Sequence, residues 1–315
     1  MTPITPLPNA LGPGAHIAII APAGPALPER RDAVLAWLTA RGMGGELLPG
    51  VFQRQDYLSG PDEQRLADLH MAFAEARFDA VFCLRGGYGT PRLLPNLDLS
   101  LIARHPKPFV GYSDITALHI AFNQAGLPTF HGPMLASDLA VNGDQQHEHA
   151  LFKLLAGKLA AGADVPTATG FPLQTLRGGK ARGPLLGGNL ALVAALAGTP
   201  WALRGDGAVL FLEDVGEEPY RIDRMLNQLK QCGLLGRVAG VILGDFALPQ
   251  GVDAQALAPL WQHYLLPLGV PVLAGWRSGH CFPNMPLPLG VAVELDADAG
   301  RLTLLQDIFA ERTPA

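Results

Sequence analysis

The sequence predicts an α/β protein with an N-terminal parallel sheet flanked by helices and a C-terminal domain of mixed α+β structure. Short apolar runs alternate with helical patterns in the first half, which is typical of parallel strands with helices on both faces. Near the end of the chain, "VAVELDAD" and "RLTLLQ" alternate between apolar and polar residues, which indicates antiparallel strands. A chain of 315 residues is also long enough for two domains.

Four buried strands are expected in the first half. Each is a short apolar run bounded by glycine or proline: "HIAIIAP" (16–22), "DAVFCLRGG" (79–87), "KPFVGYS" (107–113) and "LPTFHGP" (127–133). The apolar positions of residues 28–41 recur at helical spacing, so a helix is predicted there. These elements form a predicted N-terminal domain over residues 1–150.

A linker is predicted over residues 151–183, because "GKLAAGADVPTATGFP" is small, polar and interrupted by glycine and proline. The predicted C-terminal domain covers residues 184–315. Its first elements alternate between helices and strands, with helices expected over 189–197, 218–231 and 253–266 and strands over 208–214 and 237–246.

Composition excludes several classes of function. The net charge is −5 and charged residues are 16% of the chain, below the usual share of about 25%, which argues against a nucleic acid or an anionic membrane as a partner. No Lys or Arg precedes Arg30 and no apolar run reaches 18 residues, so neither a secretory signal nor a membrane span is expected. The three cysteines form no C-x-x-C pair, so neither a zinc site nor a disulfide framework is expected. We therefore expect a cytoplasmic protein.

Ser113 follows a predicted strand and precedes a helix, at the edge where open α/β sheets bind ligands. Its Gly-x-Ser setting resembles a nucleophile elbow, although the usual second glycine is replaced by Ile115. Gly111 is expected to remove a Cβ that would crowd the hydroxyl, and the N–H of Asp114 could face an oxyanion. The alternative is that Ser113 only caps the helix.

A glycine-rich loop, "LRGGYGTP" (84–91), follows another predicted strand. Its backbone N–H groups and Arg85 could cradle a phosphate, although the pattern is neither a P-loop nor a dinucleotide fingerprint. The loop could instead donate a second N–H to an oxyanion beside Ser113, or be a plain turn. A phosphate-binding protein is therefore an alternative to an enzyme.

A nucleophilic serine needs a histidine base, and two histidines have suitable positions. His131 and His280 each follow a strand in a loop that contains glycine, whereas His119 lies on the helix after Ser113, where a backward reach is awkward. The orienting acid is left open between Glu213 and Asp214, which end the strand "AVLFLED".

A metal site is considered at "QQHEHALF", where His147 and His149 flank Glu148. Residues at i and i+2 diverge on a helix, so a solvated helix face is predicted rather than a metal site.

Several motifs together resemble the LD-carboxypeptidase family, the serine peptidases that include muramoyltetrapeptide carboxypeptidases and microcin-immunity peptidases. They occur in family order over nearly the whole chain: "RGGYG" (85–89), "GYSD" (111–114), "HGP" (131–133), "GGNL" (187–190), "ED" (213–214) with "EPYRIDRML" (218–226), "GH" (279–280) and "PLPLG" (286–290). The resemblance implies a C-terminal domain with a β-barrel-like sheet and an active site between the domains.

The resemblance also implies a Ser-His-Glu triad, with Ser113 as nucleophile, His280 as base and Glu213 as orienting acid, and gives His131 a structural role. The oxyanion would be held by the N–H groups of Asp114 and of Gly86 or Gly87. Arg85, Tyr112 and Asn189 are expected to bind substrate, with Arg85 on its terminal carboxylate. The alternative for Arg85 is a structural ion pair.

The implied substrate is a cell-wall tetrapeptide, cut between an L-configured centre and a terminal D-alanine. For a cytoplasmic enzyme this means recycled muropeptides, and we expect a homodimer that uses neither cofactor nor metal. The alternative within the family is a microcin-type peptidase that cleaves an aminoacyl-nucleotide amide.

Overall fold

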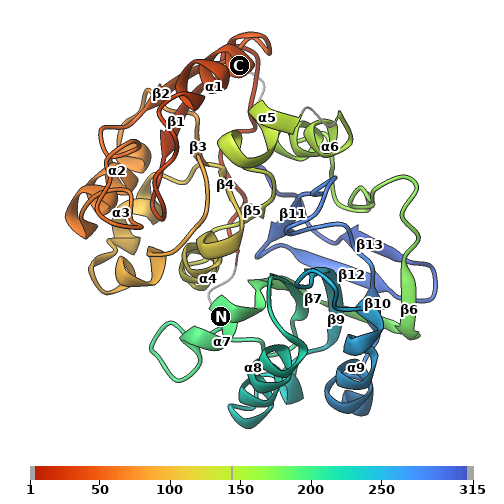
Figure 1. Cartoon of the computed structure of the whole chain (residues 1–315). Coiled ribbons are helices and arrows are strands. Elements are labelled where there is room, and N and C mark those ends of the chain that lie inside the picture. Colours follow the sequence, from red (N-terminus) through yellow and green to blue (C-terminus); the bar gives the residue numbers. More distant parts are fainter. Residues whose placement is uncertain (1–3, 143–144, 311–315) are drawn as a thin grey trace.

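The structure of the chain is a computed structural model that describes residues 4–142 and 145–310. It contains two sheets: Figure 1 shows the first in the red-to-yellow part of the chain together with the blue strand β11, and the second in the green-to-blue part. The first sheet has the strand order β11-β5-β4-β3-β1-β2. Its strands are β1 (His16–Ile20), β2 (Gly44–Leu47), β3 (Ala80–Cys83), β4 (Phe109–Gly111), β5 (Thr129–His131) and β11 (Leu287–Leu289).

Strands β1 to β5 are parallel, which confirms the prediction, and the four predicted strands are all present. β2 was not predicted, because "GGEL" offers no apolar run and forms a half-buried edge. Helices connect these strands: α1 (Arg30–Thr39), α2 (Asp62–Ala74), α3 (Leu99–Arg104) and α4 (Thr116–Gln124). Helices α5 (Ala140–Asn142) and α6 (Gln145–Leu155) follow β5.

The second sheet is mixed and curls into a half-barrel, with the strand order β13-β12-β7-β8-β9-β10-β6. Strands β7 to β10 are parallel, whereas the pairings at both edges are antiparallel, as the alternating sequence predicts for β12 and β13. The bounds are β6 (Gln174–Arg177), β7 (Lys180–Asn189), β8 (Val209–Val215), β9 (Gly240–Ala247), β10 (Val272–Ala274), β12 (Ala292–Asp296) and β13 (Arg301–Leu304). Its helices are α7 (Leu190–Leu196), α8 (Pro219–Gln231) and α9 (Ala258–Tyr264).

The segment predicted as a linker, 151–183, contains regular structure. The end of α6, the whole of β6 and the start of β7 lie within it. β6 is a mostly exposed edge strand of polar composition, so its sequence carries no apolar pattern that would reveal a strand. The boundary between the two predicted domains stays a prediction.

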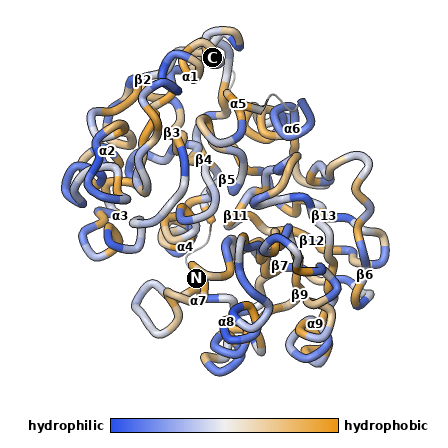
Figure 2. The backbone as a smooth tube through the Cα atoms, in the orientation of Figure 1, coloured by the Kyte–Doolittle hydropathy of each residue, from blue (hydrophilic) through white to orange (hydrophobic). Residues whose placement is uncertain are grey.

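The two halves of the chain also interlock. β11, from the late part of the sequence, pairs antiparallel with β5 and so extends the first sheet. Near the chain ends, Leu7 forms a β-bridge with Phe309. Figure 2 shows hydrophobic residues concentrated along the strands of both sheets, whereas α8 carries both hydrophilic and hydrophobic residues. The interlocking fixes the carboxyl end of β4 relative to that of β8.

Candidate active site

Ser113 lies in a strained turn between β4 and α4. Its φ is +66°, in the left-handed region, where a residue with a side chain costs roughly 1–2 kcal/mol relative to a right-handed conformation. The chain passes from an extended Tyr112 into a short 3₁₀ turn at Ser113–Ile115 and then into α4. Strain of this kind is concentrated at functional sites, and here it holds a half-buried hydroxyl above the end of the sheet.

Two glycines, Gly111 and Gly86, make room for different side chains near this turn. A Cβ at Gly111 would lie 3.0 Å from the Ile115 side chain and 3.1 Å from Cys83, so this glycine makes room for the core and not for the hydroxyl. A Cβ at Gly86 would lie 3.1 Å from the Ser113 hydroxyl. The expectation for Gly111 is therefore wrong, and Gly86 is the glycine that keeps the hydroxyl uncrowded.

Asp114 ties the glycine-rich loop to the Ser113 turn. Its carboxylate accepts a hydrogen bond from the N–H of Thr90 at 2.8 Å, and its backbone carbonyl accepts one from the Thr90 hydroxyl. The side chain is buried, which raises its pKa, although the hydrogen bonds from Thr90 act in the opposite direction. Its N–H stands at the start of a helix, where the first N–H groups have no helical partner.

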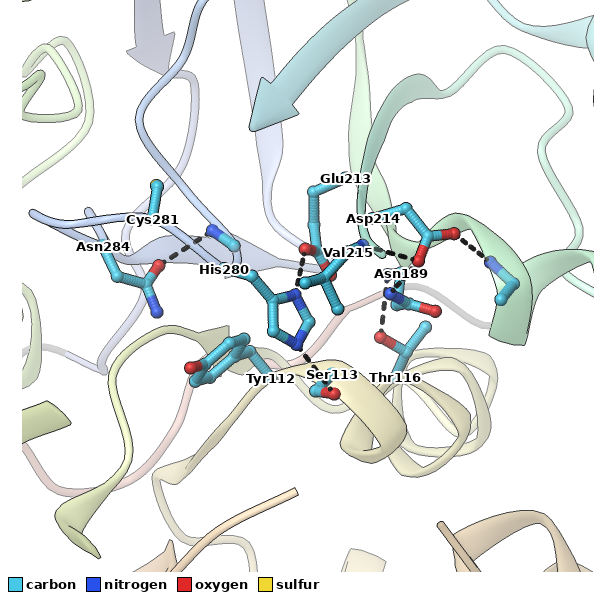
Figure 3. Close-up of polar contacts among 12 residues, drawn as sticks. Tyr112, Ser113, Thr116, Asn189, Glu213, Asp214, Val215, His280, Cys281 and Asn284 are labelled. Carbon is cyan, nitrogen blue, oxygen red and sulfur yellow. Dashed lines mark hydrogen bonds and ion pairs between the residues drawn. The ribbon is translucent and has the colours of Figure 1, made fainter. Parts of the chain in front are cut away.

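His280 lies between Ser113 and Glu213 (Figure 3). Its Nε2 is 3.1 Å from the Ser113 hydroxyl and its Nδ1 is 2.8 Å from Oε2 of Glu213. Of the two histidines that sequence reasoning left open, the structure brings His280 to the serine. His131 ends β5 in the core, against Phe211 and the ring of Tyr112.

The Glu213 side chain has room to reach His280 because two of its neighbours are glycines, which have no Cβ. Its side chain is fully buried on β8, and a Cβ on Gly279 would lie 2.4 Å from its Oε2. β9 contains an irregularity opposite Glu213, at Gly244, where a Cβ would lie 3.0 Å from the Cβ of Glu213. β-Bulges commonly re-aim side chains beside active sites, and here the bulge accommodates a buried carboxylate.

The pKa of His280 results from opposing effects. Burial is the largest influence and lowers it, but the hydrogen bond and charge of Glu213, followed by the charges of Asp214 and Asp138, outweigh burial. The net pKa is therefore raised above the ordinary value of 6.5. A raised pKa makes the imidazole a stronger base toward the serine hydroxyl.

Asp214 points to the opposite face of β8 from Glu213. Its carboxylate accepts from the side chain of Asn189 at 3.1 Å and from the N–H of Ala191 at 2.9 Å, at the start of α7. Burial raises the pKa of Asp214 to about 6, against the effect of these hydrogen bonds. Of the two acids left open by the sequence, Glu213 contacts the histidine and Asp214 holds α7.

The side chain of Asn189 is buried and makes hydrogen bonds within the protein. It is 4% exposed, and its side-chain oxygen accepts from the N–H of Leu192 and so caps α7. Both ends of its amide therefore make hydrogen bonds inside the protein, and its expected contact with substrate stays a prediction.

A direct link joins the nucleophile turn to the second sheet. The N–H of Asn189 donates to the Thr116 hydroxyl at 3.0 Å, and a Cβ on Gly188 would lie 2.5 Å from the same oxygen. Thr116 begins α4, three residues after Ser113, and Asn189 is paired in register with Glu213. Sequence reasoning missed Thr116, because a threonine in the first turn of a helix carries no distinguishing signal.

Tyr112 is also buried. Its ring lies edge-on to that of His280, with 5.0 Å between ring centroids, and its hydroxyl donates to Asp138 at 3.3 Å. Asp138 also accepts from the N–H of Met134, while burial raises its pKa to about 6. Tyr112, expected to bind substrate, therefore packs against the histidine with 6% of its surface exposed.

Arg85 is exposed beside Gly86 and donates to the Pro25 carbonyl at 3.0 Å. Among the described residues it makes no ion pair, unlike Arg277, which precedes His280 and pairs with Asp245 at 2.7 Å. A hollow of about 910 Å³ beside α6 contains none of the candidate site residues.

The two histidines of α6 have different surroundings. His147 is buried against Phe282, His149 is exposed, and Glu148 pairs with Arg41 at 2.5 Å. The prediction of divergent side chains is correct, but that of a solvated face is wrong for His147. In the part of the chain that the structure describes, no group of three or more potential ligands is arranged to hold a metal ion, and no helix is long and apolar enough to cross a membrane.

Two family models cover most of the chain. The LD-carboxypeptidase N-terminal domain matches residues 17–132, and the LD-carboxypeptidase C-terminal domain matches residues 182–295. The chain is 41% identical to a probable murein peptide carboxypeptidase of Bacillus subtilis, with 92% of this chain and 91% of that protein covered. It is 38% identical to the murein tetrapeptide carboxypeptidase of Pseudomonas aeruginosa, over 90% of this chain and 94% of that one.

Solved structures show the same fold. A muramoyltetrapeptide carboxypeptidase from Oxalobacter formigenes superposes with a TM-score of 0.80 at 31% identity, covering 95% of this chain and all of that one. MccF in complex with glutamyl sulfamoyl guanosine superposes with a TM-score of 0.89 at 22% identity, over 97% of this chain and 100% of that one. The family models, the curated relatives and the fold agree with the resemblance seen in the sequence motifs, and the chain belongs to the LD-carboxypeptidase family.

Proposed function

We propose that the protein is a serine carboxypeptidase that removes the C-terminal D-amino acid from an L-configured centre in cell-wall tetrapeptides. The observation that carries the proposal is the chain of contacts Ser113–His280–Glu213, with 3.1 Å and 2.8 Å between the hydrogen-bonding atoms. Family membership supports an enzyme rather than a phosphate-binding protein. The relatives named as murein peptide carboxypeptidases support the substrate class.

In the proposed reaction, His280 accepts the proton of Ser113 while the serine oxygen attacks the peptide carbonyl. The resulting imidazolium is stabilised by the Glu213 carboxylate, which accepts a hydrogen bond from Nδ1–H. With the proton on Nδ1, the unprotonated Nε2 of the neutral ring faces the serine. The C–N bond then breaks, and His280 returns the proton to the leaving amine. Water hydrolyses the acyl-enzyme in a second cycle of the same proton transfers.

The oxyanion would be held by backbone donors beside Ser113. Asp114 offers an N–H at the start of the 3₁₀ turn. The carbonyl of Gly86 accepts from Gly24 at 3.2 Å, and C=O and N–H point in opposite directions across a trans peptide, so the N–H of Gly87 points away from Gly24. We assign the second donor to Gly87, since this orientation leaves its N–H open.

The test uses a matched pair of peptides that end in L-Lys-D-Ala or L-Lys-L-Ala, and it measures hydrolysis as the release of free alanine. The proposal predicts release from the first peptide only, and none by Ser113→Ala. If an aminoacyl sulfamoyl nucleotide is hydrolysed and the D-alanine peptide is not, the microcin-type alternative replaces the proposal.

Arg85 is proposed to bind the terminal carboxylate, because a guanidinium matches a carboxylate with two hydrogen bonds. Arg85→Met should raise KM at least about tenfold for a free-acid substrate and much less for its C-terminal amide, since each charge-assisted hydrogen bond is worth about 1.5–3 kcal/mol. Equal changes for both substrates would give Arg85 a structural role.

The homodimer and the cytoplasmic location are also proposed, on the strength of the family resemblance. Light scattering should give a mass of twice 33.3 kDa for the dimer, and a mass of 33.3 kDa would contradict it. Cell fractionation should recover the protein with cytoplasmic markers.

A further inference from the structure

A hollow of about 840 Å³ lies at the carboxyl ends of β1, β2 and β3. We call it the switch-point crevice, and the residues that matter here are Leu27, Arg54, Tyr57, Arg85, Gly87 and Tyr88. The strand order β2-β1-β3-β4-β5 reverses between β1 and β3. Open α/β sheets bind ligands outside the carboxyl ends of the strands at such a reversal.

The crevice is separated from the nucleophile by a single peptide. Gly87 and Gly24 line it, and the carbonyl between Gly86 and Gly87 accepts from the N–H of Gly24. On its other side Gly86 faces Ser113, with 3.1 Å between an added Cβ and the hydroxyl. One residue of extended chain spans about 3.3–3.6 Å, so a substrate attacked by Ser113 can place its next residue in this crevice.

The charge of the crevice suits one carboxylate. Arg54 and Arg85 line it together with Asp56, which leaves one net positive charge. The two arginines donate only to backbone carbonyls in the described structure, Arg85 to Pro25 at 3.0 Å and Arg54 to Asp56 at 3.3 Å. Neither forms an ion pair with a described carboxylate, so both guanidinium groups have donors available for an anionic ligand.

The crevice also carries exposed apolar surface. Tyr57 and Tyr88 are 61% and 50% exposed, and their rings meet edge-on with 5.7 Å between centroids. Leu27, on the loop after β1, is 52% exposed. Exposed apolar side chains that gather beside polar groups are typical of a binding site.

We infer that the switch-point crevice binds the leaving C-terminal residue of the substrate, and that it accepts side chains much larger than the methyl group of alanine. Arg54 and Arg85 hold the carboxylate, while Tyr57 and Tyr88 contact the side chain. The volume of about 840 Å³ supports this, because a methyl group is about the size of a water molecule, which takes about 30 Å³. The inference rests on the proposed function, and it adds which C-terminal residues the enzyme accepts as the leaving group.

The experiment compares two peptides that differ only in their last residue, D-alanine or D-phenylalanine. Wild-type protein should release D-phenylalanine with a kcat/KM at least equal to that for D-alanine. The double variant Tyr57→Ala/Tyr88→Ala should lose about tenfold or more in kcat/KM for the D-phenylalanine peptide and less than about threefold for the other, since filling an apolar pocket is worth about 10–200-fold. Tyr220→Ala, which removes an equally exposed tyrosine (61%) on α8, is the control and should change neither.

Arg54→Met should raise KM about tenfold for the free acids and leave their C-terminal amides unchanged, with Arg31→Met on α1 as the control. The proposed function and this inference about the crevice are overturned by different results. If wild-type protein releases no D-alanine, the proposed function fails, and this inference fails with it. If D-alanine is released but D-phenylalanine is released at least 100-fold more slowly, or if the double variant affects both peptides equally, only the inference is overturned.

Discussion

The two halves of the candidate site are held in place by different forces. Ser113 is positioned by its own backbone, in a left-handed turn that is locked between Gly86 and the Asp114–Thr90 contacts. Glu213 and His280 are positioned by burial and charge, through a carboxylate that is enclosed by two glycines from distant segments. The Asp114–Thr90 contact on the serine side spans 24 residues of the chain, whereas the His280–Glu213 contact spans 67, so the acid–base side depends on packing of longer range.

This difference decides how each side should fail when it is altered. Removing the serine should abolish turnover and leave the fold intact, because its neighbours keep their contacts. Altering the surroundings of Glu213 should disturb both stability and catalysis, because a buried carboxylate that loses its partner is costly.

The largest effect is expected from Ser113. Ser113→Ala should reduce kcat by at least about 10³-fold, as in other triads, with little change in Tm. Ser113→Gly should be equally inactive but more stable than Ser113→Ala by roughly 1 kcal/mol, since glycine adopts a positive φ without strain. Thermal unfolding of both variants measures the strain, and equal Tm values would contradict a strained turn.

Next in size is the difference between the two adjacent acids. Glu213→Gln should lower kcat by about 10²–10⁴-fold with modest change in KM, because the amide no longer selects the tautomer of His280 or stabilises its charge. Asp214→Asn should be milder, because Asp214 faces α7. An inactive Asp214→Asn beside a normal Glu213→Gln would show that the wrong acid has been assigned.

The same variant should change the pH dependence of the residual activity. In the wild type, kcat/KM should fall on the acid side with a pKa above 6.5, because protonated His280 cannot accept the serine proton. Glu213→Gln removes the strongest of the interactions that raise the pKa of His280. Burial, which lowers this pKa, is then opposed only by the weaker effects of Asp214 and Asp138, so the acid limb should move to lower pH. A limb that stays in place would mean that another group titrates there.

A smaller loss is expected from crowding the acid. Gly279→Ala adds a Cβ at 2.4 Å from Oε2 of Glu213 at a φ of +110°, and should lower kcat by about 10–100-fold as well as Tm. The matched control is Gly269→Ala, which has a φ of +74° and open space around the added Cβ, so it should lower Tm by strain alone and keep kcat. Equal kcat for the two variants would argue against crowding of the carboxylate.

The smallest catalytic effect is expected at the link between the halves. Thr116→Val leaves the buried N–H of Asn189 without an acceptor, which costs about 1–3 kcal/mol, and should lower kcat up to about tenfold with little change in KM. The control is Thr129→Val on β5, which removes a buried hydroxyl that accepts from Asn123 on α4 and should lower Tm without changing kcat. A normal kcat in Thr116→Val would show that the link is structural only.

The sequence by itself determined the parallel first sheet, the position of Ser113 at the end of a strand, and a short set of candidates for its partners. These features are local: apolar runs, turn residues and the chemistry of a Gly-x-Ser turn suffice to predict them. The motifs in family order added the triad assignment through resemblance, and family membership follows from the comparisons.

Apart from that resemblance, only the tertiary structure decided which histidine contacts Ser113 and which acid contacts that histidine. His131 and His280 have similar local settings, and they differ because β5 carries one into the core while the loop after β10 brings the other over β8. The tertiary structure also decided that the missing Cβ of Gly111 leaves room for Ile115, and that the side chain of Asn189 caps α7. Contacts between residues far apart in the chain depend on how two sheets pack, and no local pattern of residue types encodes that distance.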